Sequence, residues 1–413
     1  MDIDMKSGKK FFATVMFVCV MFILLTPPRA ESVGSALFPR IGTYSESVKE
    51  VFEKLSTDGT KLVMNIDADD WPDVEEYDNH IQGYAIYKDL FHIFSHSDNE
   101  DYGRLIFVST TGTVKNEKEY TPDKIYTMNT PSDGYNHPGS IQLIGDYLLV
   151  GTENDDGKGK IWLYDLTTIN TSGSQFLKDP KLLRDNLSKA STVGVTDITR
   201  LDGKAVPSGK SVYAIGVMSN QELVIYTSNE VNQGNIMDIG PLTYRNRYVF
   251  KTDGDYHSIA FFCAADRSLC MVGFRAISTG SWDDHCDVYQ LTYTDGSFRE
   301  SSRRLFTEQM KTDHGAMVGS FGVHFRWGAG LQIIGDGEFS SNIRLIATQR
   351  NNTYGEVAIN IFAPKNDSMP DPTPEPQPTP SPNKGGSGGC NAGVMGALAA
   401  VVWAICRGRR PCM

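Results

Sequence analysis

The stretch that decides the fold runs from Asn136 to Leu166 and reads NHPGSIQLIGDYLLV (136–150), GTENDDGKG (151–159) and KIWLYDL (160–166). Two short apolar runs meet at Gly145-Asp146, a dipeptide typical of tight hairpin turns. An acidic, glycine-rich loop follows, and then a third run in which aliphatic and aromatic residues alternate. The pattern indicates short β-strands joined by tight turns.

The same pattern recurs along the chain at a regular spacing. Landmarks of successive copies lie 57, 56, 64 and 57 residues apart, at His80, His137, Val193, His257 and His314. Each interval holds about four short strands and too little apolar sequence to be stable by itself, so neighbouring copies must stack. Radial stacking of four-stranded antiparallel sheets is the architecture of a β-propeller.

The number of blades depends on how the last copy is interpreted. Its inner strand falls at 316–318 or at 331–334, because the segment 330–336 echoes the phrase at 139–146. The prediction is an all-β propeller with five blades, and six blades is the alternative. A strand at 61–65 precedes the first copy and matches the outer strand of the others. We expect it to close the ring beside the C-terminal strand at 356–362.

The first 30 residues have the three parts of a secretory signal peptide. Lysines precede an apolar run at 11–25, and Ala30 follows two prolines. Because Pro28 is unfavourable near a cleavage site, an uncleaved N-terminal anchor is the alternative. The signal-peptide interpretation is favoured, and it predicts that the body of the chain is exported.

Residues 31–60 are expected to form a helical brace before the propeller at 61–364. Ser45 can cap a helix that ends at Leu55. Its apolar residues recur with helical spacing: Val48, Val51, Phe52 and Leu55. Residues 365–389 then read as a stalk, since alternating prolines at 370–382 favour extended polyproline II and cannot build a core.

Residues 390–413 form a C-terminal tail that begins after Gly388-Gly389 with Cys390. A short apolar helix at 394–406 precedes three arginines, and it is shorter than the ~20 residues that usually span a bilayer. The order Gly-Gly-Cys-Asn-Ala-Gly, apolar helix and arginine cluster resembles the Synerg-CTERM sorting tails, which are similar in layout to GlyGly-CTERM tails. The resemblance covers Gly388 to Met413. It implies cleavage near Cys390 by a sorting protease and retention at a bacterial cell surface, with membrane contact through the tail. A plain C-terminal membrane anchor is the alternative.

Charge and cysteine content limit the classes of function. The chain carries a net charge of −11, which argues against nucleic acid as a partner because phosphates need a basic surface. If Asp266-Arg267 is a two-residue hairpin loop, Cys263 faces Cys270 across the ladder. Export would then favour a disulfide between them, and two buried thiols are the alternative.

The repeat places equivalent polar residues at one end of the propeller axis. The histidines are His80, His137, His257 and His314, and the nearby carboxylates are Asp78, Asp255 and Asp313. Neutral imidazoles can bind a divalent metal or act as a general base, and a satisfied turn is the structural alternative. No catalytic motif marks a nucleophile.

Together these features favour a surface-anchored propeller that binds a glycan, peptide or protein ligand and is not an enzyme. A hydrolase that acts on carbohydrate or a phosphorylated compound, using carboxylates or a metal at the channel mouth, is the alternative. The sequence assigns no cofactor beyond this metal hypothesis.

Overall fold

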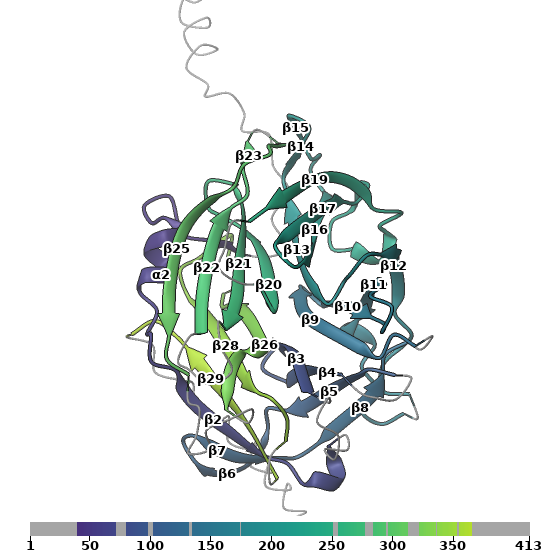
Figure 1. The fold of residues 1–413 in the computed structure, drawn as a ribbon, viewed down its shortest axis with the longest axis vertical. Helices are drawn as coiled ribbons and strands as arrows, with labels where there is room; N and C mark the ends of the chain where they lie inside the picture. The colour runs from purple at the N-terminus through teal and green to yellow at the C-terminus, as the bar shows by residue number, and fades with distance from the viewer. Residues whose placement is uncertain are drawn as a thin grey trace, which may run out of the picture. The chain divides into compact units, whose positions relative to one another are not determined.

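Five antiparallel sheets surround a common axis in the computed structural model (Figure 1). The structure describes residues 39–365 except 72–79, 98–101, 132–133, 174, 251–254, 277–283, 295, 313–321, 336 and 353–354. The inner strands of adjacent sheets contact one another all the way around the ring, including the last with the first. The described strands therefore form a five-bladed β-propeller, and the six-bladed alternative is wrong.

Each blade has four strands ordered from the axis outward. Blade 1 contains β3 (His80–Tyr87), β4 (Phe91–Ser97), β5 (Arg104–Ser109) and β8 (Ile125–Asn129). Blade 2 contains β9 (His137–Ile144), β10 (Tyr147–Glu153), β11 (Gly159–Asp165) and β12 (Lys181–Leu187). Blade 3 contains β13 (Thr192–Ile198), β16 (Lys210–Ser219), β17 (Glu222–Thr227) and β19 (Thr243–Val249).

The last two blades complete the ring. Blade 4 contains β20 (Ser258–Cys263), β21 (Leu269–Ala276), β22 (Asp284–Gln290) and β25 (Arg303–Met310). Blade 5 contains β26 (Val323–Ile333), β28 (Ile343–Gln349), β29 (Glu356–Phe362) and β2 (Thr60–Asn65). The inner strand β26 thus includes most of the segment 331–334, one of the two positions that the sequence left open.

Short strands and 3₁₀ turns lie outside the four-stranded blades. Additional strands are β1 (Arg40–Ile41), β6 (Gly112–Asn116), β7 (Glu119–Pro122), β14 (Arg200–Leu201), β15 (Lys204–Ala205), β18 (Val231–Asn232), β23 (Tyr293–Thr294), β24 (Ser297–Phe298) and β27 (Phe339–Ser340). Single 3₁₀ turns lie at Ala68–Asp70, Leu166–Thr168 and Ile236–Asp238.

Blade 2 shows how the sequence produces this arrangement. Tyr147 pairs with Ile144 across the predicted turn, where Gly145 has a φ of 58° that favours glycine. Inner strands also approach one another closely. At Gly139 an added methyl group would lie 1.6 Å from the carbonyl oxygen of Ser191, so that position requires glycine.

The apolar core consists of five clusters, one between each pair of adjacent blades. Between blades 1 and 2, for example, Phe107 packs in the same cluster as Val150 and Tyr164, and all three are fully buried. Both faces of every blade are therefore covered. This explains why a single copy has too little apolar surface to be stable by itself.

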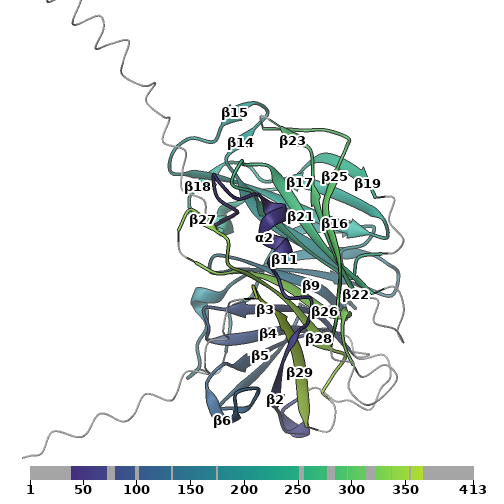
Figure 2. The same ribbon diagram turned by 90° about the vertical axis from the view of Figure 1, so that its left-hand side faces the viewer.

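The N-terminal strand closes the ring as the sequence predicted. Strand β2 pairs antiparallel with β29, with Val63 opposite Ala358, and Figure 2 shows these two strands side by side. The hairpin β6–β7 inserted in blade 1 continues this sheet, because β7 pairs in parallel with β2. Buried Met64 and Tyr120 share the apolar cluster between blades 5 and 1.

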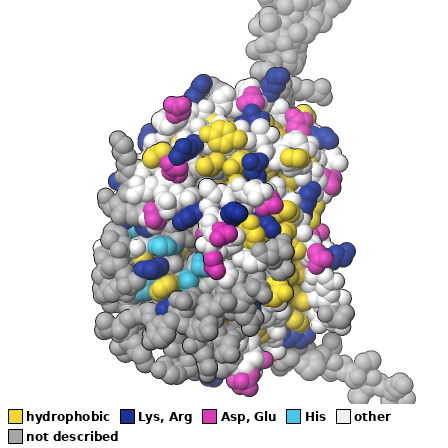
Figure 3. Space-filling model, turned by 45° about the vertical axis from the view of Figure 1, so that its right-hand side comes forward, with side chains coloured by type: hydrophobic (Ala, Val, Ile, Leu, Met, Phe, Trp, Pro, Cys, Tyr) yellow, Lys and Arg dark blue, Asp and Glu magenta, His cyan; other side chains and the backbone are white. Residues whose placement is uncertain are grey.

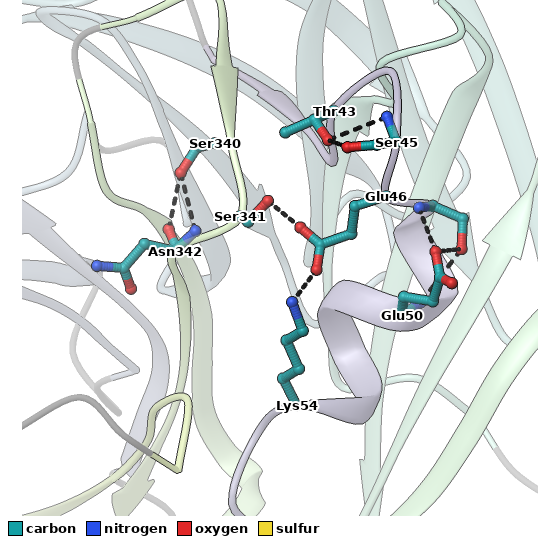
Figure 4. A network of polar contacts seen from close by, with 9 residues as sticks. Thr43, Ser45, Glu46, Glu50, Lys54, Ser340, Ser341 and Asn342 are labelled. Atoms are coloured by element: carbon teal, nitrogen blue, oxygen red, sulfur yellow. Dashed lines mark hydrogen bonds and ion pairs between the residues drawn. The ribbon is translucent and has the colours of Figure 1, made fainter.

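The predicted helical brace is present but shorter than expected. Helix α2 spans Val48–Glu53 and is capped by Ser47, not Ser45, in a reciprocal capping box with Glu50. Its Phe52 stacks on Phe262 of blade 4 at 5.9 Å between ring centres. Glu46 bonds both Lys54 and Ser341, which fastens the segment to blade 5 (Figure 4).

The predicted disulfide is wrong. The turn after β20 places Cys263 opposite Leu269, and Cys270 opposite Phe262, one residue out of the expected register. Because side chains alternate along a strand, this shift sends the two cysteines to opposite faces of blade 4. They lie in different apolar clusters, and Cys263, Cys270 and Cys286 are all free and buried.

The expected signal peptide, stalk and sorting tail with Gly388, Gly389 and Cys390 lie outside the described residues. Within the part of the chain that is described, no helix is long and apolar enough to cross a membrane.

Candidate functional site

The channel mouth is the end of the axis where the inner strands begin. His80 is the first residue of β3, His137 is the first residue of β9, and His257 directly precedes β20. Figure 3 shows histidine side chains gathered beside Lys or Arg side chains on one face of the molecule. The repeat therefore does bring predicted site residues to one end of the ring.

Two of these histidines meet at one amide group. The rings of His80 and His137 lie 5.5 Å apart between centres, at an interplanar angle of 66°. The side-chain nitrogen of Gln82 contacts Nε2 of His137 at 2.8 Å and also contacts Nε2 of His80. Because an amide nitrogen carries two protons, it can donate one to each imidazole.

The contact with Gln82 determines the tautomer of His80. An amide nitrogen only donates, so Nε2 of His80 is the acceptor and a neutral His80 carries its proton on Nδ1. Nδ1 lies 3.1 Å from the hydroxyl oxygen of Ser97. The same hydroxyl group lies 3.1 Å from the carbonyl oxygen of His80 and accepts from the His80 backbone N–H at 3.1 Å. Nε2 of His80 then carries a lone pair, which faces Gln82.

Burial lowers the pKa of two histidines at the channel mouth, His137 and His257. Desolvation lowers the pKa of His137, and the nearby carboxylates of Glu153 and Asp155 offset part of that effect. Desolvation and the neighbouring Arg326 lower the pKa of His257 to about 4. Neutral imidazole is the form that accepts hydrogen bonds and binds metals.

Blade 5 contributes an aromatic and cationic side of the channel mouth. The ring of Trp327 lies 5.5 Å from that of His80. The guanidinium groups of Arg326 and Arg350 lie 5.2 and 5.1 Å from the Trp327 ring centre. Trp327 is 6% exposed, and its indole Nε1 has no hydrogen-bond partner among the described residues.

The axis below the channel mouth is bridged by side chains. Ser258 of β20 donates to the carbonyl oxygen of Gln82 on β3 at 3.4 Å. Deeper in, Gln142 of β9 donates to the carbonyl of Phe261 at 2.8 Å and accepts from the backbone N–H groups of Phe261 and Val195. Hydrogen bonds between inner strands therefore cross the axis below the channel mouth.

The structure does not describe all of the predicted site residues. Asp78, Asp313 and His314 lie outside the described residues. Asp255 is exposed and lies close enough to His257 to influence its pKa. No group of three or more His, Cys, Asp or Glu side chains within the described ranges could hold a metal ion.

Sequence reasoning missed important residues of the site. Gln82 lies two positions after His80, and alternation along a strand could have identified it as a residue on the same face. Asp284 is a fully buried residue of β22. It bonds Nδ1 of His324 at 3.1 Å and the backbone N–H of Phe325 at 3.0 Å. Trp327 follows an irregular part of β26 that no sequence pattern marks.

A second concavity lies at the opposite end of the axis. This pocket of about 360 Å³ is lined by the ends of β3, β9 and β26 and by Pro39. Asp146, just beyond β9, accepts a hydrogen bond from Tyr87 at 2.9 Å and pairs with Lys88. None of the predicted site residues lines it.

Likenesses to known proteins are distant. No protein-family model and no curated protein matches the chain. The parainfluenza virus 5 hemagglutinin-neuraminidase ectodomain is 11% identical, with 83% of this chain and 79% of that chain covered and a TM-score of 0.35. A Bacteroides ovatus protein provisionally named a hydrolase is 10% identical, with coverages of 68% and 84% and a TM-score of 0.35.

A third similar structure is the β-propeller domain of Nup133 from Vanderwaltozyma polyspora. It is 11% identical, with coverages of 71% and 73% and a TM-score of 0.27. At this level of similarity, the fold assignment rests on the strand pairing described above, and no function is transferred.

Proposed function

We propose that this protein is an exported, surface-anchored β-propeller that binds an extracellular glycan at the channel mouth without transforming it. The signal-like segment at 1–30, the proline stalk and the sorting-like tail support export and anchoring. The polar and aromatic side chains gathered at the channel mouth support ligand binding.

The observation that carries the proposal is the unpaired donor of Trp327. A buried polar group without a partner costs about 1–3 kcal/mol, so such groups are rare unless something else satisfies them. Nε1 of Trp327 is a buried atom, and the Trp327 ring lies 5.5 Å from that of His80 at the channel mouth. A ligand that supplies an oxygen acceptor would satisfy this donor.

The charges around the channel mouth indicate the chemistry of that ligand. Carboxylates of Glu153, Asp155 and Asp255 lie near the histidines and disfavour a strongly anionic ligand. On the blade 5 side of the channel mouth, the Arg326 guanidinium beside Trp327 carries hydrogen-bond donors, and a neutral imidazole can both donate and accept. This combination suits a neutral ligand rich in hydroxyl groups, and a neutral oligosaccharide has that chemistry.

The test is binding of the purified full-length chain to an array of neutral oligosaccharides, acidic oligosaccharides and peptides. Neutral oligosaccharides should bind, and Trp327→Phe, which removes the Nε1 donor but keeps the ring, should weaken binding up to about tenfold. Tyr244→Phe, on the exposed face of β19, is the matched control and should leave binding unchanged. Binding restricted to peptides or acidic sugars, or equal binding by Trp327→Phe, would contradict the proposal.

Export is tested separately by adding protease to intact cells that produce the protein. Digestion of the propeller from the outside, with loss of surface retention when residues 388–413 are removed, is the expected result. If the added protease left the whole chain undigested in intact cells, the proposed export would be wrong.

A further inference from the structure

Two histidines of the channel mouth present their nitrogen lone pairs to one point. Nε2 of His80 and Nε2 of His137 both contact the same atom, the side-chain nitrogen of Gln82. The amide nitrogen of Gln82 only donates, so Nε2 of His80 accepts and a neutral His80 carries its proton on Nδ1, which faces the Ser97 hydroxyl. Nε2 of His137 accepts the other amide proton. Two acceptors that converge on one atom form a chelating pair.

The spacing of the two rings fits a shared metal ion. Two imidazoles that bind one tetrahedral ion through Nε2 at ~2.0–2.1 Å have ring centres roughly 5 Å apart. The observed separation of the His80 and His137 ring centres is 5.5 Å. Little rearrangement of the two rings is needed for both to reach one cation.

The surroundings of the pair have the features that support metal-binding histidines. A ligating histidine usually donates its other ring N–H to a fixed acceptor, which orients the ring, and Ser97 does this for His80. Glu153 and Asp155 lie near His137 and favour a positive charge there. The strand pairing of His80 with Ser97, and of His137 with Glu153, makes both contacts part of the blade framework.

We propose that His80 and His137 bind a divalent transition-metal ion, with zinc as the representative, at the point where the Gln82 amide nitrogen lies. Rotation of the Gln82 amide would replace its nitrogen with its oxygen as a third ligand. Water would complete the coordination and leave positions open for ligand hydroxyl groups. This last role rests on the proposed glycan-binding function, whereas metal binding itself does not.

The experiment is calorimetric titration of zinc chloride into the metal-free full-length chain, in the absence of any sugar. We expect one zinc ion per chain, with at least a tenfold loss of affinity in His80→Ala and in His137→Ala. His257→Ala is the matched control, because His257 holds the equivalent position in blade 4 and makes no described contact with Gln82. Its affinity for zinc should equal that of the unmodified chain.

A gain-of-affinity variant keeps the test decisive if an alanine variant does not fold. Gln82→Glu places a carboxylate at the same point and creates a two-histidine, one-carboxylate site. We expect it to bind zinc at least tenfold more tightly. No zinc binding by the unmodified chain, or binding that none of these substitutions changes, would overturn the metal site. Glycan binding that persists in EDTA would leave the proposed function standing, so the two failures are distinguishable.

Discussion

Blades 2 and 5 have the same four-stranded plan but are built from the chain in different ways. All four strands of blade 2 follow one another in sequence, from β9 to β12. Blade 5 takes three strands from the C-terminal end and its outer strand, β2, from the N-terminal end, and it is extended by a hairpin from blade 1. Both blades supply residues of the channel mouth, His137 from blade 2 and Trp327 from blade 5. The site therefore depends on a blade that forms only when the two chain ends meet.

The largest loss of stability is expected at strand β2, which joins the N-terminal part of the chain to blade 5. Met64→Asp puts a carboxylate into the fully buried cluster between blades 5 and 1, and we expect a loss of at least about 4 kcal/mol of unfolding free energy. Denaturant unfolding measures this. Val114→Asp, on the exposed strand β6 at the edge of the same sheet, is the control and should change stability by about 0.5 kcal/mol or less. Similar losses in both variants would contradict the closing role of β2.

Two substitutions that create cavities of similar size, one in blade 2 and one in blade 5, compare the stability of the two blades. Leu149→Ala in β10 and Ile359→Ala in β29 each remove a fully buried side chain and should cost about 2–5 kcal/mol. Hydrogen exchange should separate them. Ile359→Ala should speed exchange in β2, because Leu62 pairs with Ile359, and Leu149→Ala should not. If β2 exchanged at the same rate in both variants, the stability of β2 would not depend specifically on its pairing with β29.

Blade 1 lies between blades 5 and 2 in the ring, and it should lose stability at acidic pH. His92 of blade 1 is buried, and desolvation lowers its pKa from the ordinary 6.5 to about 4. Between these values the unfolded chain binds a proton and the folded chain does not, so stability falls as pH decreases from 6.5 towards 4. The expected loss from this group is on the order of 3 kcal/mol. Melting temperatures across this range should fall less steeply for His92→Gln, and an unchanged slope would refute the assignment.

The smallest effect concerns the hairpin that reinforces closure. The hydroxyl of Tyr120 in β7 donates to the carbonyl oxygen of Ser109 at 3.1 Å in a buried position. Tyr120→Phe should cost about 0.5–1.5 kcal/mol in thermal or denaturant unfolding. Tyr244→Phe, on an exposed outer strand, should cost nothing measurable. A cost above that of the Leu149→Ala cavity would give the hairpin a larger role than this structure supports.

The repeat could be predicted from the sequence because each blade must bury both faces, and this requirement repeats the apolar pattern at a regular spacing. The same spacing predicted that His80 and His137 lie together and that the N-terminal strand completes the last blade. Closure could be predicted because the strand before the first copy had no other partner in the repeat.

Features set by local register could not be predicted in this way. The pairing of Cys263 depended on one residue of turn length, and composition does not determine turn length. Trp327 lies in β26 where its pairing with β28 shifts between His324 and Ala329, and the segment gives no alternating signal. The role of Ser97 depends on its contacts with the backbone and ring of His80, which form only in the folded blade.

Cross-linking of the two chain ends tests the central claim, that ring closure brings the first and last blades together at the channel mouth. Val63 and Ala358 are directly opposed in antiparallel strands, at a spacing that a disulfide can bridge. The full-length chain with Val63→Cys and Ala358→Cys should form this bond on oxidation, detected by mass spectrometry of the linked peptides. Val63→Cys with Val357→Cys, one residue out of register and on the opposite face, should not. Absence of the first bond, or equal formation of both, would contradict the closed five-bladed ring.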